Sequence, residues 1–195
     1  IVGLIGLVLI QLSGITVSGP TYAAVLTMTG FGFFGKTPLN ILPILAGVYI
    51  AARLMKKPFS SYLIIALFGT ALGPLVSFLA WEIGLAWIPA LLIGGVGGLV
   101  IGFLLPALAV SMLHLHQGYN LYNMGLTCGF LGLFAFALLK GFGAEFAGTL
   151  HWYEGSAAGA LYTVPVLSLA LLVSGALLGG KGVLKELIAI QGISG

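Results

Sequence analysis

The chain has 195 residues, of which 60% are hydrophobic and 6% are charged. A soluble monomer exposes far more polar surface to water, so this composition excludes an ordinary soluble domain and indicates that lipid is the main solvent. Seven Lys or Arg and four acidic residues give a net charge of +3, and most lie between apolar runs, so we expect an all-α integral membrane protein that contacts the lipid bilayer and binds no nucleic acid.

Apolar runs of helical length predict about six to seven hydrophobic helices. We expect them at 1–18, 21–34, 38–55, 59–83, 86–113, 119–140 and 156–180, followed by a short amphipathic helix at 182–191. The chain begins inside an apolar run and ends without a charged tail. We therefore interpret residues 1–195 as a single transmembrane domain and as one half-repeat of a larger membrane protein.

The run at 21–34 is too short to cross a bilayer and leads into the Gly- and Phe-rich stretch 30–35. Irregular backbone at membrane depth is tolerated only where protein or a watery cavity surrounds it. This stretch therefore predicts a short broken or re-entrant segment. Thr37 and Pro38 follow as an N-cap and a proline at the first helical position, so a helix should begin there.

Glycines indicate where helices pack closely. Gly94, Gly98 and Gly102 recur at every fourth residue within one apolar run, the spacing that lets two membrane helices approach. Gly125 and Gly129 form a similar stripe in the next run. We predict that both stripes are helix-packing surfaces.

A polar cluster at 114–127 is enclosed by apolar sequence on both sides. On a helix, Asn120, Asn123 and Thr127 fall within roughly 60° of one another, opposite the glycine stripe. Such a face suits a neutral, hydrogen-bonding solute, although the same residues would also hold helices together. The residues predicted to line a solute path, here and at the helix start near 36–40, are Thr37, Asn40, His116, Gln117, Tyr119, Asn120, Asn123 and Thr127.

No enzyme signature is found. His114 and His116 are two residues apart, on different sides of a helix, and no acidic or thiol ligand accompanies them in sequence. Cys128 is alone in an apolar helix and favours a packing role. We expect no metal, no other cofactor and no catalytic residues.

Two segments resemble known families. Residues 37–51, TPLNILPILAGVYIA, and the Gly118-Tyr119-Asn120 step that leads to Met124-Gly125-Leu126 resemble a family of uncharacterised bacterial multi-span proteins with a duplicated membrane domain. More distantly, their order is similar to one repeat of the urea transporters. This chain departs from that repeat at two places. The urea-transporter motif has Asn before Pro, whereas here Asn40 comes after Pro38, and this chain has Tyr119 where the motif has Phe.

The resemblance implies half of an inverted-repeat transporter or channel, with broken helices that meet near the midplane. Its partner would be a second half-repeat or an identical subunit, so a homo-oligomer is expected. We predict a channel or secondary-transporter half for a small polar, neutral solute such as urea, an amide or ammonia, in the bacterial cytoplasmic membrane. The alternative is a structural or assembly subunit without its own transport pathway.

The positions of the basic residues predict the topology. Arg53, Lys56 and Lys57 lie between two runs, and Lys181 and Lys185 follow the last long one, so both loops should be cytoplasmic. Single cysteines introduced at Lys57 and at Lys185 should not react with a membrane-impermeant maleimide added to intact cells. Strong labelling at either position would contradict this topology.

Overall fold

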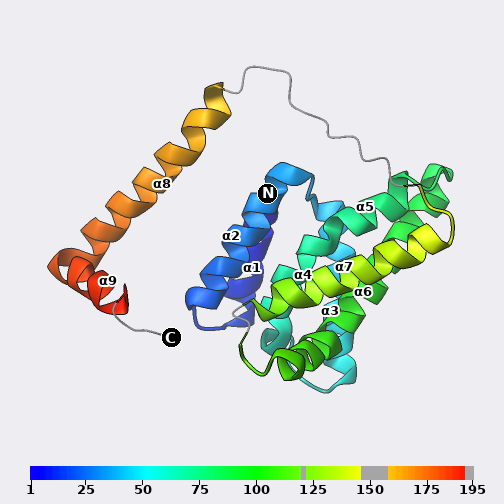
Figure 1. The fold of residues 1–195 in the computed structure, drawn as a ribbon, viewed down its shortest axis with the longest axis horizontal. Coiled ribbons are helices and arrows are strands. Elements are labelled where there is room, and N and C mark those ends of the chain that lie inside the picture. Colours follow the sequence, from blue (N-terminus) through cyan, green and yellow to red (C-terminus); the bar gives the residue numbers. More distant parts are fainter. Residues whose placement is uncertain (120–121, 146–157, 192–195) are drawn as a thin grey trace. The chain divides into compact units, whose positions relative to one another are not determined.

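A computed structural model describes residues 1–119, 122–145 and 158–191 (Figure 1). The chain divides into two compact units, Ile1–Phe146 and Ala147–Gly195, here called unit 1 and unit 2. All regular structure in the described residues is helical, so the predicted all-α class is confirmed. The prediction of a single domain is not tested by this division and stays a prediction.

Unit 1 holds most of the helices. Its elements are α1 Val2–Ser13, α2 Gly19–Gly30, η1 Phe31–Phe34, α3 Pro38–Leu54, η2 Phe59–Tyr62, α4 Leu63–Gly69, η3 Thr70–Leu72, α5 Gly73–Trp81, α6 Trp87–His116 and α7 Asn123–Gly141, where η marks a 3-10 turn. Unit 2 contains α8 Ala158–Gly179, η4 Gly180–Gly182 and α9 Val183–Gln191.

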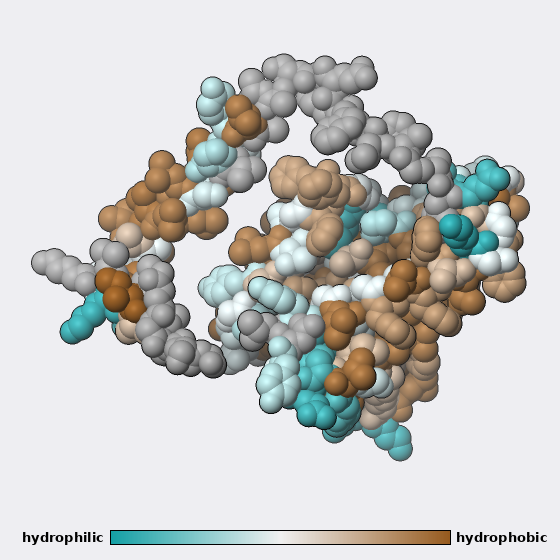
Figure 2. Space-filling view, in the orientation of Figure 1, coloured by the Kyte–Doolittle hydropathy of each residue, from teal (hydrophilic) through white to brown (hydrophobic). Residues whose placement is uncertain are grey.

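Four helical segments of the described chain are long and apolar enough to cross a membrane. They are Phe59–Trp81, Trp87–His116, Asn123–Gly141 and Leu161–Gly179. In Figure 2, apolar residues cover the sides of unit 1, and hydrophilic residues gather near its two ends, where α3 leads to α4 and where α5 leads to α6. Apolar side chains on the outside and polar groups at the ends fit a multi-pass membrane protein.

Two helix boundaries differ from the prediction at the polar cluster. We expected one helix to end at residue 113 and the next to begin at 119, but α6 continues to His116 and α7 begins at Asn123. The backbone of Gln117 and Gly118 adopts positive φ angles of 51° and 87°. A left-handed residue ends a helix, and glycine takes that conformation without strain. His116 and Asn123 therefore lie at two facing helix ends.

The run at 59–83 was predicted as one helix, and the structure has one helical segment there, Phe59–Trp81, in which the 3-10 turn η3 separates α4 from α5. Pro74 lacks the N–H that would donate to the Thr70 carbonyl in a continuous α-helix. In addition, the Thr70 hydroxyl donates to the Leu67 carbonyl, at 2.6 Å. Both features favour a tight 3-10 turn at Thr70–Leu72 between two helical pieces.

The glycine stripe of α6 lies against α3 and α5. A Cβ on Gly102 would overlap the Ile44 carbonyl of α3, and a Cβ on Gly47 of α3 would overlap the Leu99 carbonyl of α6. A Cβ on Gly94 would lie 2.8 Å from that of Ala80 in α5. The backbones of α3 and α6 thus meet directly, with no side chain between them, and only glycine fits on the facing surfaces.

This contact predicts that Gly102→Ala destabilises the protein, because the added methyl group meets a backbone carbonyl that no side-chain rotation can move. We expect the free energy of unfolding to fall by about 1–3 kcal/mol or more, seen as a lower melting temperature and loss of monodispersity in detergent. Gly95→Ala is the matched control, since a Cβ there meets no atom within 4 Å. Equal melting temperatures for the two variants would contradict the packing argument.

Candidate site at two helix breaks

Two breaks in the helices of unit 1 lie side by side. The first runs from η1 through Gly35, whose φ is 85°, to the start of α3. The second is η3, between α4 and α5. Lys36 Nζ joins them by donating to Thr70 Oγ1 at 2.8 Å, and Asn40 Nδ2 donates to Ser77 Oγ of α5 at 2.9 Å. The breaks therefore form one polar region inside an apolar unit.

Asn40 organises the start of α3. Its Oδ1 accepts from the Thr37 N–H at 2.9 Å, and its Nδ2 also donates to the Gly35 carbonyl at 3.0 Å. Together with the Thr37 side chain it forms a capping box, so the predicted helix start at Thr37 and Pro38 is confirmed. Gly73 allows this approach, since a Cβ there would lie 3.0 Å from Asn40 Oδ1. With 4% of its surface exposed, Asn40 is fully engaged by protein groups.

Lys36 is a buried cation that the sequence analysis passed over. Only 5% of its surface is exposed, and besides the bond to Thr70 its ammonium lies 5.0 Å from the ring centroid of Phe31. The described carboxylates of unit 1, Glu82 and Glu145, line a separate cavity. The available signal was a single lysine in the middle of an otherwise apolar stretch, where a charge is costly and usually functional.

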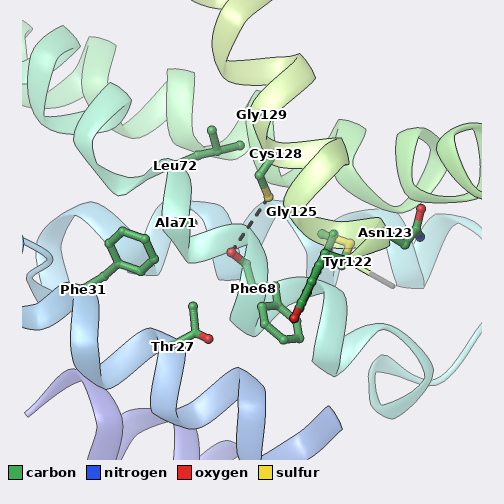
Figure 3. Close-up of a pocket in the computed structure, with 11 residues that line it drawn as sticks. Thr27, Phe31, Phe68, Ala71, Leu72, Tyr122, Asn123, Gly125, Cys128 and Gly129 are labelled. Atoms are coloured by element: carbon green, nitrogen blue, oxygen red, sulfur yellow. Dashed lines mark hydrogen bonds between the residues drawn. The ribbon is translucent and has the colours of Figure 1, made fainter. Parts of the chain in front are cut away.

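A cavity of about 600 Å³ lies next to the two breaks (Figure 3). It is bounded by α2 and η1, by the end of α4 with η3, and by the start of α7. Its lining residues are Thr27, Phe31, Phe68, Ala71, Leu72, Tyr122, Asn123, Met124, Gly125, Cys128 and Gly129. We call it the α7 cavity. Its walls are mostly apolar, with a few neutral polar groups.

A second cavity of about 570 Å³ lies at the other end of the polar region. Thr37 and Asn40 of α3 line it together with Ser77 of α5 and Gly94 of α6. The predicted site residues therefore fall into two groups. Thr37 and Asn40 line this second cavity, whereas Asn123 lines the α7 cavity.

A hydrogen-bonded chain joins the end of α6 to the start of α7. The Gly118 N–H donates to His116 Nδ1 at 3.2 Å, so Nδ1 carries no proton and His116 Nε2 is the donor to Asn123 Oδ1, at 2.9 Å. Asn123 Nδ2 then donates to the Ala109 carbonyl at 3.0 Å. Asn123 thus both lines the cavity and holds two helices together.

The two faces of α7 differ from the prediction. Thr127 has no exposed surface and donates to the Asn123 carbonyl of its own helix at 2.7 Å, on a buried stripe with Met124, Cys128 and Leu131. Gly125 and Gly129, expected at a packing surface, line the cavity instead. The reason is that α7 buries the stripe of Met124, Thr127, Cys128 and Leu131, and Gly125 and Gly129 lie beside that stripe on the face that borders the cavity.

Two further predicted residues, Gln117 and Tyr119, line neither cavity. Gln117 and Tyr119 are exposed at the link after α6, and Asn120 lies outside the described residues. Among the described residues, no group of three or more His, Cys, Asp or Glu side chains could hold a metal ion.

Comparison with known proteins gives one match. No curated protein and no solved structure matches the chain. A family described as protein of unknown function, DUF1576, matches residues 1–141. The matched range contains every helix of unit 1, both breaks and the residues of the α7 cavity. The chain therefore belongs to the DUF1576 family.

Proposed function

We propose that the protein is a transport domain, a channel or secondary-transporter half, for a small polar solute. The observation that carries the proposal is the meeting of two helix breaks inside an apolar helical unit, next to a cavity. Transporters that use broken helices place solute sites at such points, because the breaks free backbone and side-chain polar groups in the membrane interior.

Helix breaks and a buried charge cost free energy in an apolar unit, and this cost supports a functional role. Continuous apolar helices satisfy all their own backbone hydrogen bonds in lipid, whereas a break requires partners from elsewhere. Here the partners include Lys36, Asn40, Thr70 and Ser77, and Lys36 carries a charge that lipid and apolar protein solvate poorly. A purely structural unit gains little stability from these groups.

The size and lining of the α7 cavity also support the proposal. About 600 Å³ is within the usual range for small-molecule sites, which are mostly apolar with a few placed polar groups. Asn123 supplies an amide, and Gly125 and Gly129 keep one wall open. In this proposal these three residues of α7 face the solute.

The similarity to one urea-transporter repeat is consistent with this placement. The first of its two segments coincides with the start of α3, which borders the second cavity. The second segment leads into the first turn of α7, which borders the α7 cavity. We extend the proposal to an inverted-repeat architecture in the bacterial cytoplasmic membrane, with re-entrant or broken elements completed by a second half-repeat or an identical subunit.

The second candidate function is a structural or assembly subunit. It is favoured by one observation: Asn40, Asn123 and Thr127 each have protein partners. Polar side chains that are satisfied in this way can serve only to hold membrane helices together. A flux measurement distinguishes the two functions.

We expect Gly129→Leu to block transport without unfolding the protein. A Cβ on Gly129 meets no atom within 4 Å, so a leucine there fills the cavity instead of displacing a neighbouring group. Flux of urea, methylamine, acetamide, glycerol and lactate is measured in proteoliposomes that contain the purified protein. The solute that moves through the unaltered protein should move at least about 10-fold more slowly through the variant, the effect of a barrier raised by about 1.4 kcal/mol.

The control is Gly141→Leu, at the end of the same helix, where a Cβ also meets no atom within 4 Å and which does not line the cavity. Its flux should equal that of the unaltered protein. If none of the five solutes moves through the unaltered protein, or if Gly129→Leu transports normally, the transport proposal is wrong.

Asn123→Leu separates solute contact from helix attachment. Loss of the amide leaves His116 and the Ala109 carbonyl without this partner, so the free energy of unfolding should fall by about 1–3 kcal/mol. If Asn123 also binds the solute, flux per folded molecule should fall as well, by roughly 5-fold to 150-fold. Both are measured on one preparation, and reduced stability with unchanged flux would favour the structural subunit.

A further inference from the structure

We propose that Lys36 binds the carboxylate of the transported solute, so that the α7 cavity takes small monocarboxylates. The inference rests on the proposed transport function and changes its substrate class, which the amides and hydroxyls of the sequence had predicted to be neutral. It is argued from the partners of Lys36, the charge around it and the place of those partners at the cavity wall.

The hydrogen bonding of Lys36 leaves donor capacity unused. An ammonium group has three N–H donors. In the structure one of them reaches Thr70 Oγ1, at 2.8 Å, and the ring of Phe31 lies 5.0 Å away as a weak cation–π partner. Both partners are neutral, and the Thr70 hydroxyl donates its own proton to the Leu67 carbonyl. The buried charge is therefore solvated far less well than it would be in water.

No acidic side chain of unit 1 neutralises Lys36 within the described residues. The chain contains no Asp, and Glu82 lies 12 positions after Thr70, about 18 Å along a helix axis. Glu82 and Glu145 line another cavity together. In addition, Lys36 immediately precedes the N-cap of α3, and the positive end of a helix dipole disfavours a cation there. A bound anion would both neutralise the ammonium and offset the unfavourable interaction with the helix dipole.

Lys36 does not itself line the α7 cavity, but its cation–π partner Phe31 does, and so does the neighbour of its hydrogen-bond partner Thr70. Phe31, which carries the cation–π contact, is a lining residue with 42% of its surface exposed. Ala71, the neighbour of Thr70, is another lining residue. Figure 3 shows the Phe31 ring and Cys128 on facing sides of the cavity. The proposal therefore requires the Phe31 side chain to rotate, so that a ligand in the cavity reaches the ammonium.

The lining of the cavity selects among anions. One cation neutralises one negative charge, so a doubly charged phosphate would keep an uncompensated charge in apolar surroundings. Phe68, Leu72 and Met124 offer apolar surface for a short carbon chain, and Asn123 offers an amide for a second polar group. A small monocarboxylate matches this combination.

The test compares lactate with lactamide, which have nearly the same shape and differ in charge. Both are measured at pH 7.5 in proteoliposomes and as ligands that raise the melting temperature of the purified protein. We expect saturable lactate flux that exceeds lactamide flux, and a larger melting shift with lactate. Lys36→Met should lower lactate flux and lactate affinity by about 10-fold or more, as expected for loss of a hydrogen bond to a charged group.

Lys57→Met is the matched control, because Lys57 is an exposed lysine in the link after α3 and its loss changes the net charge equally. It should leave lactate flux and affinity unchanged. Lys36→Arg keeps the charge and should retain part of the lactate flux. If Lys36→Met does not fold, the test uses the rise in melting temperature that lactate and lactamide cause in the unaltered protein and in Lys36→Arg. Equal rises with the two ligands overturn the proposal.

The outcomes separate this inference from the proposed function. Lactate transport that is unchanged in Lys36→Met, or lactamide flux equal to lactate flux, overturns the role of Lys36. The transport function then stands if Gly129→Leu still blocks the solute that moves. Absence of flux for every solute overturns both proposals.

Discussion

Unit 1 depends on one constraint: in apolar surroundings, every polar group that a helix break exposes must find its partner within the protein. The break before α3 is satisfied by Asn40, which takes up the Thr37 N–H and the Gly35 carbonyl and reaches Ser77. Lys36 reaches across to Thr70 at the second break. Neither break could persist in lipid alone, so the two fix each other's position, and α3, α4 and α5 are arranged around their meeting point.

The same constraint explains why polar residues alone identify a solute path poorly. Thr127 is polar, yet it has no exposed surface and bonds to its own helix, and Asn40, which borders the second cavity, is hydrogen-bonded to Ser77. What marks the α7 cavity is the opposite feature, small residues such as Gly125 and Gly129 that leave space. Lys36 differs from all of these, since it is buried and charged with only neutral partners in the described part of unit 1.

Local signals in the sequence predicted local structure. The all-α class, the break after residue 30 and the helix start at Pro38 follow from hydrophobicity, glycine and the Thr37 cap, which act over a few residues. The 3-10 turn at Thr70–Leu72 was not predicted, because one threonine and one proline barely alter the hydrophobicity of a long apolar run. The faces of α7 were assigned from periodicity alone, which cannot tell which side meets α4 and α6. The Lys36–Thr70 pair spans 34 positions, and no local pattern connects them.

The glycine contact between α3 and α6 also limits how the protein can move. Where a backbone carbonyl faces a glycine with no side chain between, as at Ile44 and Gly102, helices cannot slide by changing rotamers, because each step would place a larger residue against the backbone. These two helices therefore behave as a rigid body. The α7 cavity lies outside this contact, between α2, η3 and α7. Under the proposed transport function, the movement that opens the cavity takes place there and not between α3 and α6.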